Sequence, residues 1–206
     1  MFLFWWIEKR TENPADSIFA KCLSAGLKIV SAKLTDYMIN SKIDWKLGKN
    51  KDNAIVEWIP ICSVIFSDGH KRIIGLSKDG FWINVFESPR TENLFVIKNR
   101  EDCYYIMAII DKERIEIESS IEKGLDLNDL SIKLIDTFPF KEIIKYSLII
   151  GRHWGIKATK WIRQKEFDEE LCNITRMIIE KKELDQRSRH DLFKMMNRFE
   201  KQKTNR

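Results

Sequence analysis

The chain has 206 residues and a formal net charge of +5, and its composition is 44% hydrophobic and 33% charged. This composition excludes a disordered chain, and a chain of this length can hold its core without disulfides or metals. No apolar run reaches the roughly 18 residues of a membrane span. The apolar N-terminus lacks the basic start and the cleavage site of a signal peptide, so a cytoplasmic location with no membrane partner is expected.

The first elements along the chain are predicted to be a strand and a long helix. Residues 2–8 are aromatic and β-branched, which is typical of a strand. Asn13 suits a helix N-cap and Pro14 the first helical position, and an apolar face of helical period continues to about Ser41. The polar segment 44–52 is interpreted as a loop.

The stretch 53–86 predicts three antiparallel strands joined by two tight turns. Both turns, at 67–70 and 77–80, carry Asp-Gly between apolar runs, which is a strong hairpin signal. A primed turn needs positive φ at its central residues, and glycine adopts that conformation without steric cost. A turn-rich loop follows at 87–93, and a fourth strand is expected at 94–97.

The second half of the chain is predicted to be helical. An apolar helix begins after Asn99 and continues to about Asp111, and residues 112–123 fit either a helix or a strand. Residues 130–135 are equally ambiguous. Amphipathic helices are expected at about 137–150, 154–164, 166–182 and 183–200.

Together these elements predict an α+β fold. We expect a single domain with an antiparallel meander sheet of four to five strands, packed by an N-terminal helix and a C-terminal helical block. The α+β domain is expected over residues 1–180, and residues 181–206 form a basic C-terminal helix docked on it.

The excess positive charge lies entirely in the last segment. Residues 181–206 hold nine basic and four acidic residues, a net of +5, and the rest of the chain sums to zero. Any electrostatic attraction to nucleic acid is therefore confined to this segment. The candidate nucleic-acid-binding residues are Arg187, Arg189, Lys194, Arg198 and Lys201.

No motif predicts catalysis, and no catalytic residue, metal or cofactor is assigned. The four cysteines lie in apolar runs without metal-ligand spacing, as reduced buried thiols do. Cys62 and His70 fall on neighbouring predicted strands, but the run around Cys62 is typical of a core. The Asp44–Lys46 pair resembles a nuclease motif only superficially, because it follows a helix. A site assembled from distant residues is the enzymatic alternative.

The seven tryptophans suggest a partner-binding surface. Trp82 and Ile83 point to opposite faces of one predicted strand, so either both faces are buried or one is offered to a partner. We expect a non-enzymatic protein-binding protein of the bacterial cytosol, in its most specific form an immunity protein that neutralises a toxin domain. The candidate partner-binding residues are Trp58, Trp82, Asp68, His70 and Asp79.

The alternative hypothesis is a nucleic-acid-associated protein that binds through its basic C-terminal helix. One feature counts against an inhibitor of nucleases: such inhibitors profit from an acidic face, and the body of this chain is neutral. The two hypotheses differ in the expected salt dependence of binding.

Overall fold

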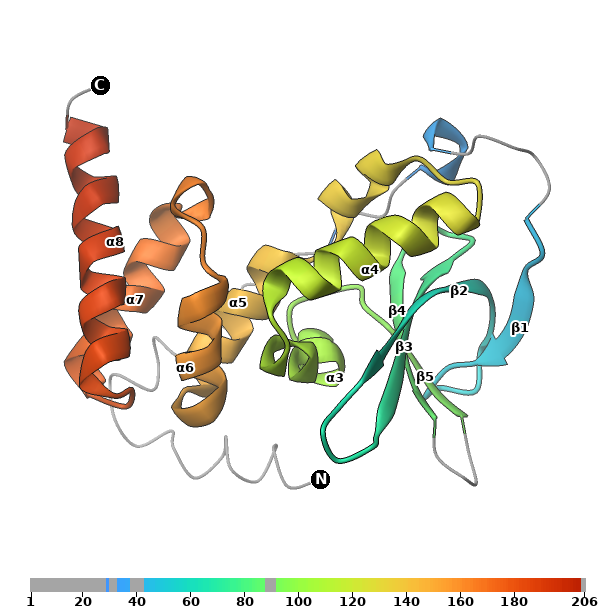
Figure 1. The fold of residues 1–206 in the computed structure, drawn as a ribbon, viewed down its shortest axis with the longest axis horizontal. Helices are drawn as coiled ribbons and strands as arrows, with labels where there is room; N and C mark the ends of the chain where they lie inside the picture. Colours follow the sequence, from blue (N-terminus) through green and yellow to red (C-terminus); the bar gives the residue numbers. More distant parts are fainter. Residues whose placement is uncertain (1–28, 30–32, 38–42, 88–91, 205–206) are drawn as a thin grey trace.

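The computed structural model describes residues 29, 33–37, 43–87 and 92–204. A sheet lies at one end of the molecule and a block of helices at the other (Figure 1). The strands are β1 (Lys46–Lys49), β2 (Ile55–Ile65), β3 (Lys71–Ser77), β4 (Trp82–Glu87) and β5 (Glu92–Val96). The α-helices are α3 (Cys103–Ile106), α4 (Arg114–Leu127), α5 (Phe140–Ile150), α6 (Arg152–Trp161), α7 (Glu169–Lys181) and α8 (Gln186–Thr204). Short 3-10 helices are η1 (Leu34–Asp36), η2 (Met107–Asp111), η3 (Ile132–Thr137) and η4 (Gln164–Glu166).

The five strands form an antiparallel meander in which each strand pairs with the next, and this confirms the predicted α+β sheet. The turn type differs from the prediction. In the β2–β3 turn only Gly69 has positive φ (82°), its N–H donates to Phe66 O (3.0 Å), and Phe66 N–H donates to His70 O (2.9 Å). The β3–β4 turn repeats this arrangement around Gly80. Both are three-residue loops with a left-handed glycine, so the expectation of primed turns was wrong.

Strand β1 lies within the segment 44–52, where a loop was expected. A parallel bridge from Asn50 to Leu94 brings this end of the chain to β5, so the sheet curls. Gly48 fits the closure because a β-carbon there would lie 2.9 Å from Trp58 Nε1 and 2.8 Å from Leu94 Cδ1. This contact between distant segments stabilises a strand in a polar sequence. The strand propensity of these residues alone does not predict it.

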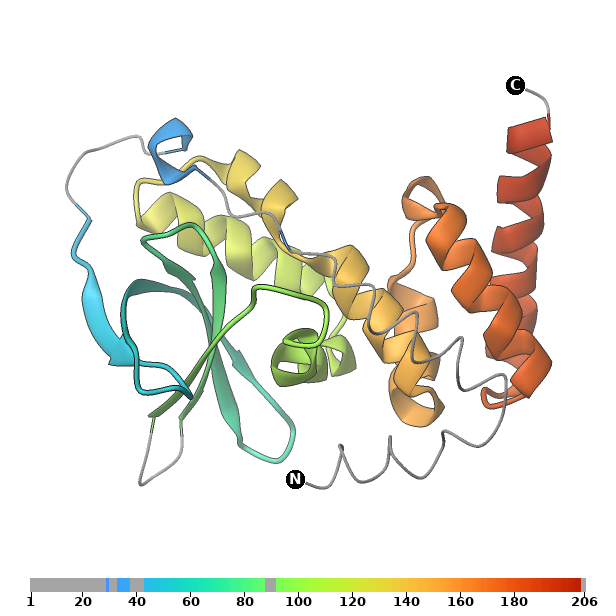
Figure 2. The same ribbon diagram turned by 180° about the vertical axis from the view of Figure 1, so that it is seen from behind.

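Both faces of the sheet are buried at its central strands β3 and β4. The concave face encloses a small cluster of Trp58, Ile83, Val85 and Leu94. The opposite face packs on the helices, with α4 running across the strands (Figures 1 and 2). Of the two alternatives for the meander, burial on both sides is the one observed.

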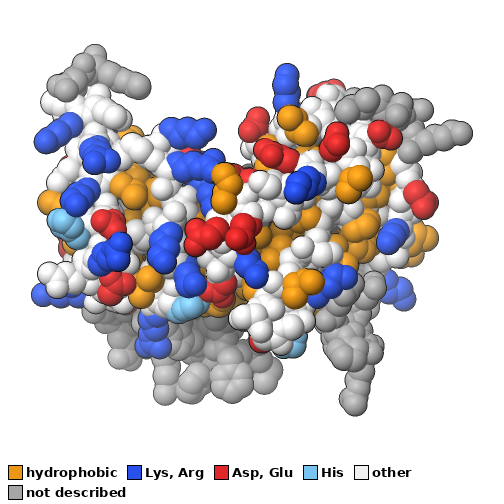
Figure 3. All heavy atoms as spheres, viewed as in Figure 1, with side chains coloured by type: hydrophobic (Ala, Val, Ile, Leu, Met, Phe, Trp, Pro, Cys, Tyr) orange, Lys and Arg blue, Asp and Glu red, His pale blue; other side chains and the backbone are white. Residues whose placement is uncertain are grey.

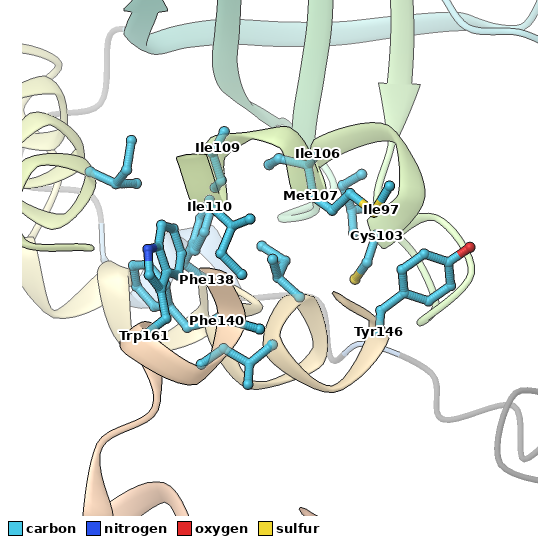
Figure 4. Packing of buried hydrophobic residues seen from close by; sticks show 14 of the residues in the cluster. Ile97, Cys103, Ile106, Met107, Ile109, Ile110, Phe138, Phe140, Tyr146 and Trp161 are labelled. Atoms are coloured by element: carbon cyan, nitrogen blue, oxygen red, sulfur yellow. The ribbon is translucent and has the colours of Figure 1, made fainter. Parts of the chain in front are cut away.

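The first helices after the sheet join it to the helical block. Figure 4 shows Ile109 and Ile110 from η2 beside Phe138, Phe140 and Trp161. All five side chains are buried. After a break at Lys112 the chain continues as α4, so the open segment 112–123 is largely helical and not a strand.

The N-terminal part of the prediction has little support. The expected strand at 2–8 lies outside the described residues, as does most of the helix expected from Asn13 to Ser41. Within that range, Leu34–Asp36 forms one 3-10 turn, and Ile29 N–H donates to Lys98 O (2.9 Å). The described residues therefore do not support a packed N-terminal helix. The expected C-terminal helices correspond to α5, α6, α7 and α8.

Candidate functional site

Helix α8 carries the predicted cations, and a capping carboxylate sets its start. Ser188 N–H donates to Asp185 Oδ1 (2.8 Å), and the Ser188 hydroxyl donates to Asp185 Oδ2 (2.9 Å). These bonds, the backbone one most, hold the pKa of Asp185 below its usual value. The ionised carboxylate thus satisfies a free N–H group of the first turn.

One face of α8 is buried, and this fixes how the helix is rotated. Leu192 is fully buried and Met196 almost so. The Phe199 ring lies 5.8 Å from that of Phe167, and Gln164 Nε2 donates to Met195 O (3.3 Å). Helix α8 packs mainly against α7 and partly against α6. The burial of this face therefore fixes which of the other faces of α8 point to solvent and which point to α6.

A groove of about 540 Å³ lies between α6 and α8. Many Lys and Arg side chains lie over these two helices on the face shown in Figure 3. The cations that line the groove are Lys160 from α6 and Arg187, Lys194 and Arg198 from α8.

These four cations are not neutralised within the described part of the chain. None of them forms a salt bridge to a described residue, whereas Lys203, further along α8, pairs with Glu169 (2.8 Å). The groove also holds the carboxylates of Asp185 and Asp191. Four cations against two carboxylates leave the groove net positive, and a concave positive surface attracts anions.

Four of the five predicted nucleic-acid-binding residues share one face of α8. They follow one another at intervals of seven, four and three residues, which come close to whole turns of an α-helix. They are Arg187, Lys194, Arg198 and the exposed Lys201. Arg189 lies on another side of the helix, and its Nε atom is buried without a hydrogen-bond partner. Sequence reasoning missed Lys160, because no local signal indicates that α6 and α8 are neighbours.

The predicted partner-binding residues are not brought together. Trp58 is 5% exposed and lies in the cluster on the concave face of the sheet. Trp82 is 1% exposed and lies in the core between the sheet and the helices. Trp82 Nε1 donates to Thr137 Oγ1 (3.0 Å), which satisfies its polar atom inside the protein. Neither ring is available to a partner in this conformation.

The other three predicted partner-binding residues are exposed but lie far apart. Asp68 and His70 belong to the β2–β3 turn, whereas Asp79 belongs to the β3–β4 turn. These turns lie at opposite ends of the seven-residue strand β3, which spans about 23 Å. A single contact patch containing all three is excluded by this separation unless the partner covers the length of the sheet.

The three cysteines in the described part of the chain show no sign of an activated thiol. Cys62 lies opposite Ile74 in the strand register, not opposite His70, so the two candidate groups do not face each other. Burial raises the pKa of Cys62 to about 12, and it raises that of Cys103 as well. Cys172 also has a raised pKa, through burial. Because the thiolate is the nucleophile, raised pKa values indicate inert cysteines.

A buried ionic cluster joins the sheet to the helices. Arg100, which is fully buried, contacts Glu142 and Glu170 at 2.6 Å each, and Lys145 Nζ lies 2.7 Å from Glu170. Burial alone would lower the pKa of Lys145, but the neighbouring carboxylates outweigh it and raise the pKa. The amine stays protonated, so the cluster fits a structural role better than a nucleophilic one.

The described residues contain no group of three or more His, Cys, Asp or Glu side chains placed to hold a metal ion. Within the same part of the chain, no helix is long and apolar enough to cross a membrane. No family model, curated protein or solved structure matches this chain.

Proposed function

We propose that this protein associates with nucleic acid through the groove between α6 and α8. The observation that supports the proposal is the convergence of four cations, Lys160 from one helix and three from the other, none of which forms a salt bridge to a residue that the structure describes. Phosphate groups are the partners that such cations bind in nucleic-acid complexes.

The length of the cationic face favours a polymer over a single phosphate group. From Arg187 to Lys201 the helix rises about 21 Å. One strand of a stacked duplex carries a phosphate about every 3.4 Å, so this face lies within reach of several consecutive phosphates. A mononucleotide would use only part of it.

The direct test is the binding of a fluorescent oligonucleotide to the full chain, measured by anisotropy. If four cations each contact a phosphate, log K should fall with log salt concentration at a slope of about −3. A mononucleotide should displace the oligonucleotide poorly. Equal displacement by a mononucleotide, or binding that is indifferent to salt, would contradict the proposal.

A matched pair of variants locates the site. Lys194→Glu with Arg198→Glu reverses two groove charges, and we expect at least about a tenfold loss of affinity. Lys123→Glu with Lys133→Glu makes the same charge change at exposed positions outside the groove. If both variants weaken binding equally, the effect comes from net charge and the groove is not the site.

One observation favours a second candidate, the protein-binding role with its toxin-neutralising form. Leu47 and Ile55 are 72% and 71% exposed and lie diagonally on the β1–β2 pair, where Lys49 is opposite Ile55. Exposed apolar side chains of this kind are used as protein contacts. Co-purification of one stoichiometric protein at high salt, lost in Leu47→Ser with Ile55→Ser, would support this role. Retention of that protein by the double variant would place the contact elsewhere.

A further inference from the structure

We infer that the groove receives an unpaired nucleotide, so that its ligand is a single strand and not a duplex. This inference rests on the proposed function and specifies the form of nucleic acid. It follows from the two helices that form the groove and from the apolar side chains among its lining residues.

The position of the cations excludes the usual way in which a helix reads a duplex. The major groove of B-DNA is about 12 Å wide and admits one α-helix, whose diameter with side chains is about 10–12 Å. The cations of α8 line a groove whose other wall is α6, which carries Lys160. Insertion of this face would carry both helices into a space that fits one. A single strand has no such restriction.

Apolar side chains lie among the charged ones that line the groove. Ile156, Ile162 and Met195 line it together with Thr159, Ser188 and the cations. A duplex presents phosphates at its outside, and these gain nothing from an apolar surface. An unpaired base presents its flat face to such a surface while its phosphates stay near the cations at the rim.

The size of the groove agrees with this placement. Sites for small organic ligands have volumes of about 300–1,000 Å³, and this groove measures about 540 Å³. No aromatic ring is among the described residues that line it. The nucleotide base is therefore held by aliphatic contacts and not by ring stacking, and binding should tolerate different nucleotide bases.

Three probes with equal numbers of phosphates test the inference on the full chain by fluorescence anisotropy. They are an oligothymidine, an abasic strand of the same length, and a short hairpin duplex. We expect the oligothymidine to bind at least about fivefold more tightly than either of the others, because only it places a base on the apolar surface. Equal binding of the abasic strand, or tighter binding of the duplex, would overturn the inference.

A variant of an apolar residue that lines the groove provides the second measurement. Met195→Ala should weaken oligothymidine binding about fivefold and leave abasic-strand binding unchanged. The control is Phe193→Ala, because Phe193 is 46% exposed on the same helix but does not line the groove. Equal effects of the two variants, or none from Met195→Ala, would overturn the inference.

The outcomes also separate the inference from the function on which it rests. If none of the three probes binds, the proposed nucleic-acid association fails. If all three bind alike and the charge reversal at Lys194 and Arg198 weakens them alike, the association stands and the single-strand inference fails.

Discussion

The α-carbon of Gly124 in helix α4 lies against the backbone of Ile61 in strand β2. A β-carbon at Gly124 would be 1.9 Å from the Ile61 carbonyl oxygen, closer than any two such atoms can come. The neighbouring Asn128 Nδ2 donates to Pro60 O (3.3 Å), which continues the contact between helix and strand. The absence of a side chain at one position thus sets how closely α4 packs on the sheet.

Gly124→Ala should destabilise the protein despite the higher helix propensity of alanine. The obstacle is backbone, which cannot rotate away as a side chain can, so we expect a loss of about 3 kcal/mol in the free energy of unfolding. Urea denaturation measures it. Lys123→Ala, one residue earlier and exposed, should change stability by less than about 0.5 kcal/mol. A Gly124→Ala protein as stable as the Lys123→Ala protein would contradict the packing described here.

An ion pair at the start of α4 predicts how the free energy of unfolding depends on pH. Arg114 Nη1 and Nη2 donate to the two carboxylate oxygens of Glu166 (2.5 and 2.6 Å). Burial alone would raise the pKa of Glu166, but the hydrogen bonds and charge of Arg114 outweigh it and lower the pKa. A carboxylate with a lowered pKa in the folded state stabilises the fold fully above its unfolded pKa, near 4.5, and loses that contribution as the pH falls through the folded pKa.

Glu166→Gln should therefore be less stable at pH 7, by about 2 kcal/mol, because the buried Arg114 loses its bidentate carboxylate partner and keeps only Glu118 as an ionic partner among the described residues. Its stability should also fall less steeply than that of the wild type below pH 4.5. Thermal unfolding followed from pH 7 to pH 3 measures both effects. The exposed Glu122→Gln serves as the control and should follow the wild-type curve. Parallel curves for wild type and Glu166→Gln would show that this pair does not contribute to acid sensitivity.

The half-buried Asp191 lies in the groove beside the cations of α8. Removal of its negative charge should raise the affinity for an oligonucleotide, by about threefold at low salt for charges separated by several ångströms of partly hydrated groove. Asp191→Asn makes this change at nearly constant volume, and fluorescence anisotropy measures the result. The exposed Asp129→Asn removes the same charge elsewhere and should leave the affinity almost unchanged. A loss of affinity in Asp191→Asn would instead indicate that the carboxylate contacts the ligand directly.

Cys62 should react slowly with alkylating reagents while the protein is folded. Its pKa of about 12 leaves very little thiolate at pH 8, so labelling by iodoacetamide should be at least about 100-fold slower than in denaturant. Peptide mass spectrometry isolates the rate at this residue from those of the other cysteines. Rapid labelling of the folded protein would mean that the thiol is activated and that a nucleophilic role must be considered.

The sequence determined the elements that depend on local chemistry. The two Asp-Gly turns and the apolar runs between them indicated the meander, and the helical period of apolar residues indicated the helix over about 137–150 that the structure shows as α5. The helical spacing of Arg187, Lys194, Arg198 and Lys201 was likewise present in the sequence and placed four cations on one face. These features can be predicted from the sequence because turn conformation and helical period depend on a few neighbouring residues.

Tertiary structure decided the features that depend on contacts between distant segments. β1 is a strand because the sheet curls until Asn50 reaches Leu94, and Trp58 is buried because that curl has an interior. Lys160 joins the cations of α8 only because α6 packs beside that helix. Such contacts depend on packing between elements far apart in the chain, and no short stretch of sequence encodes them.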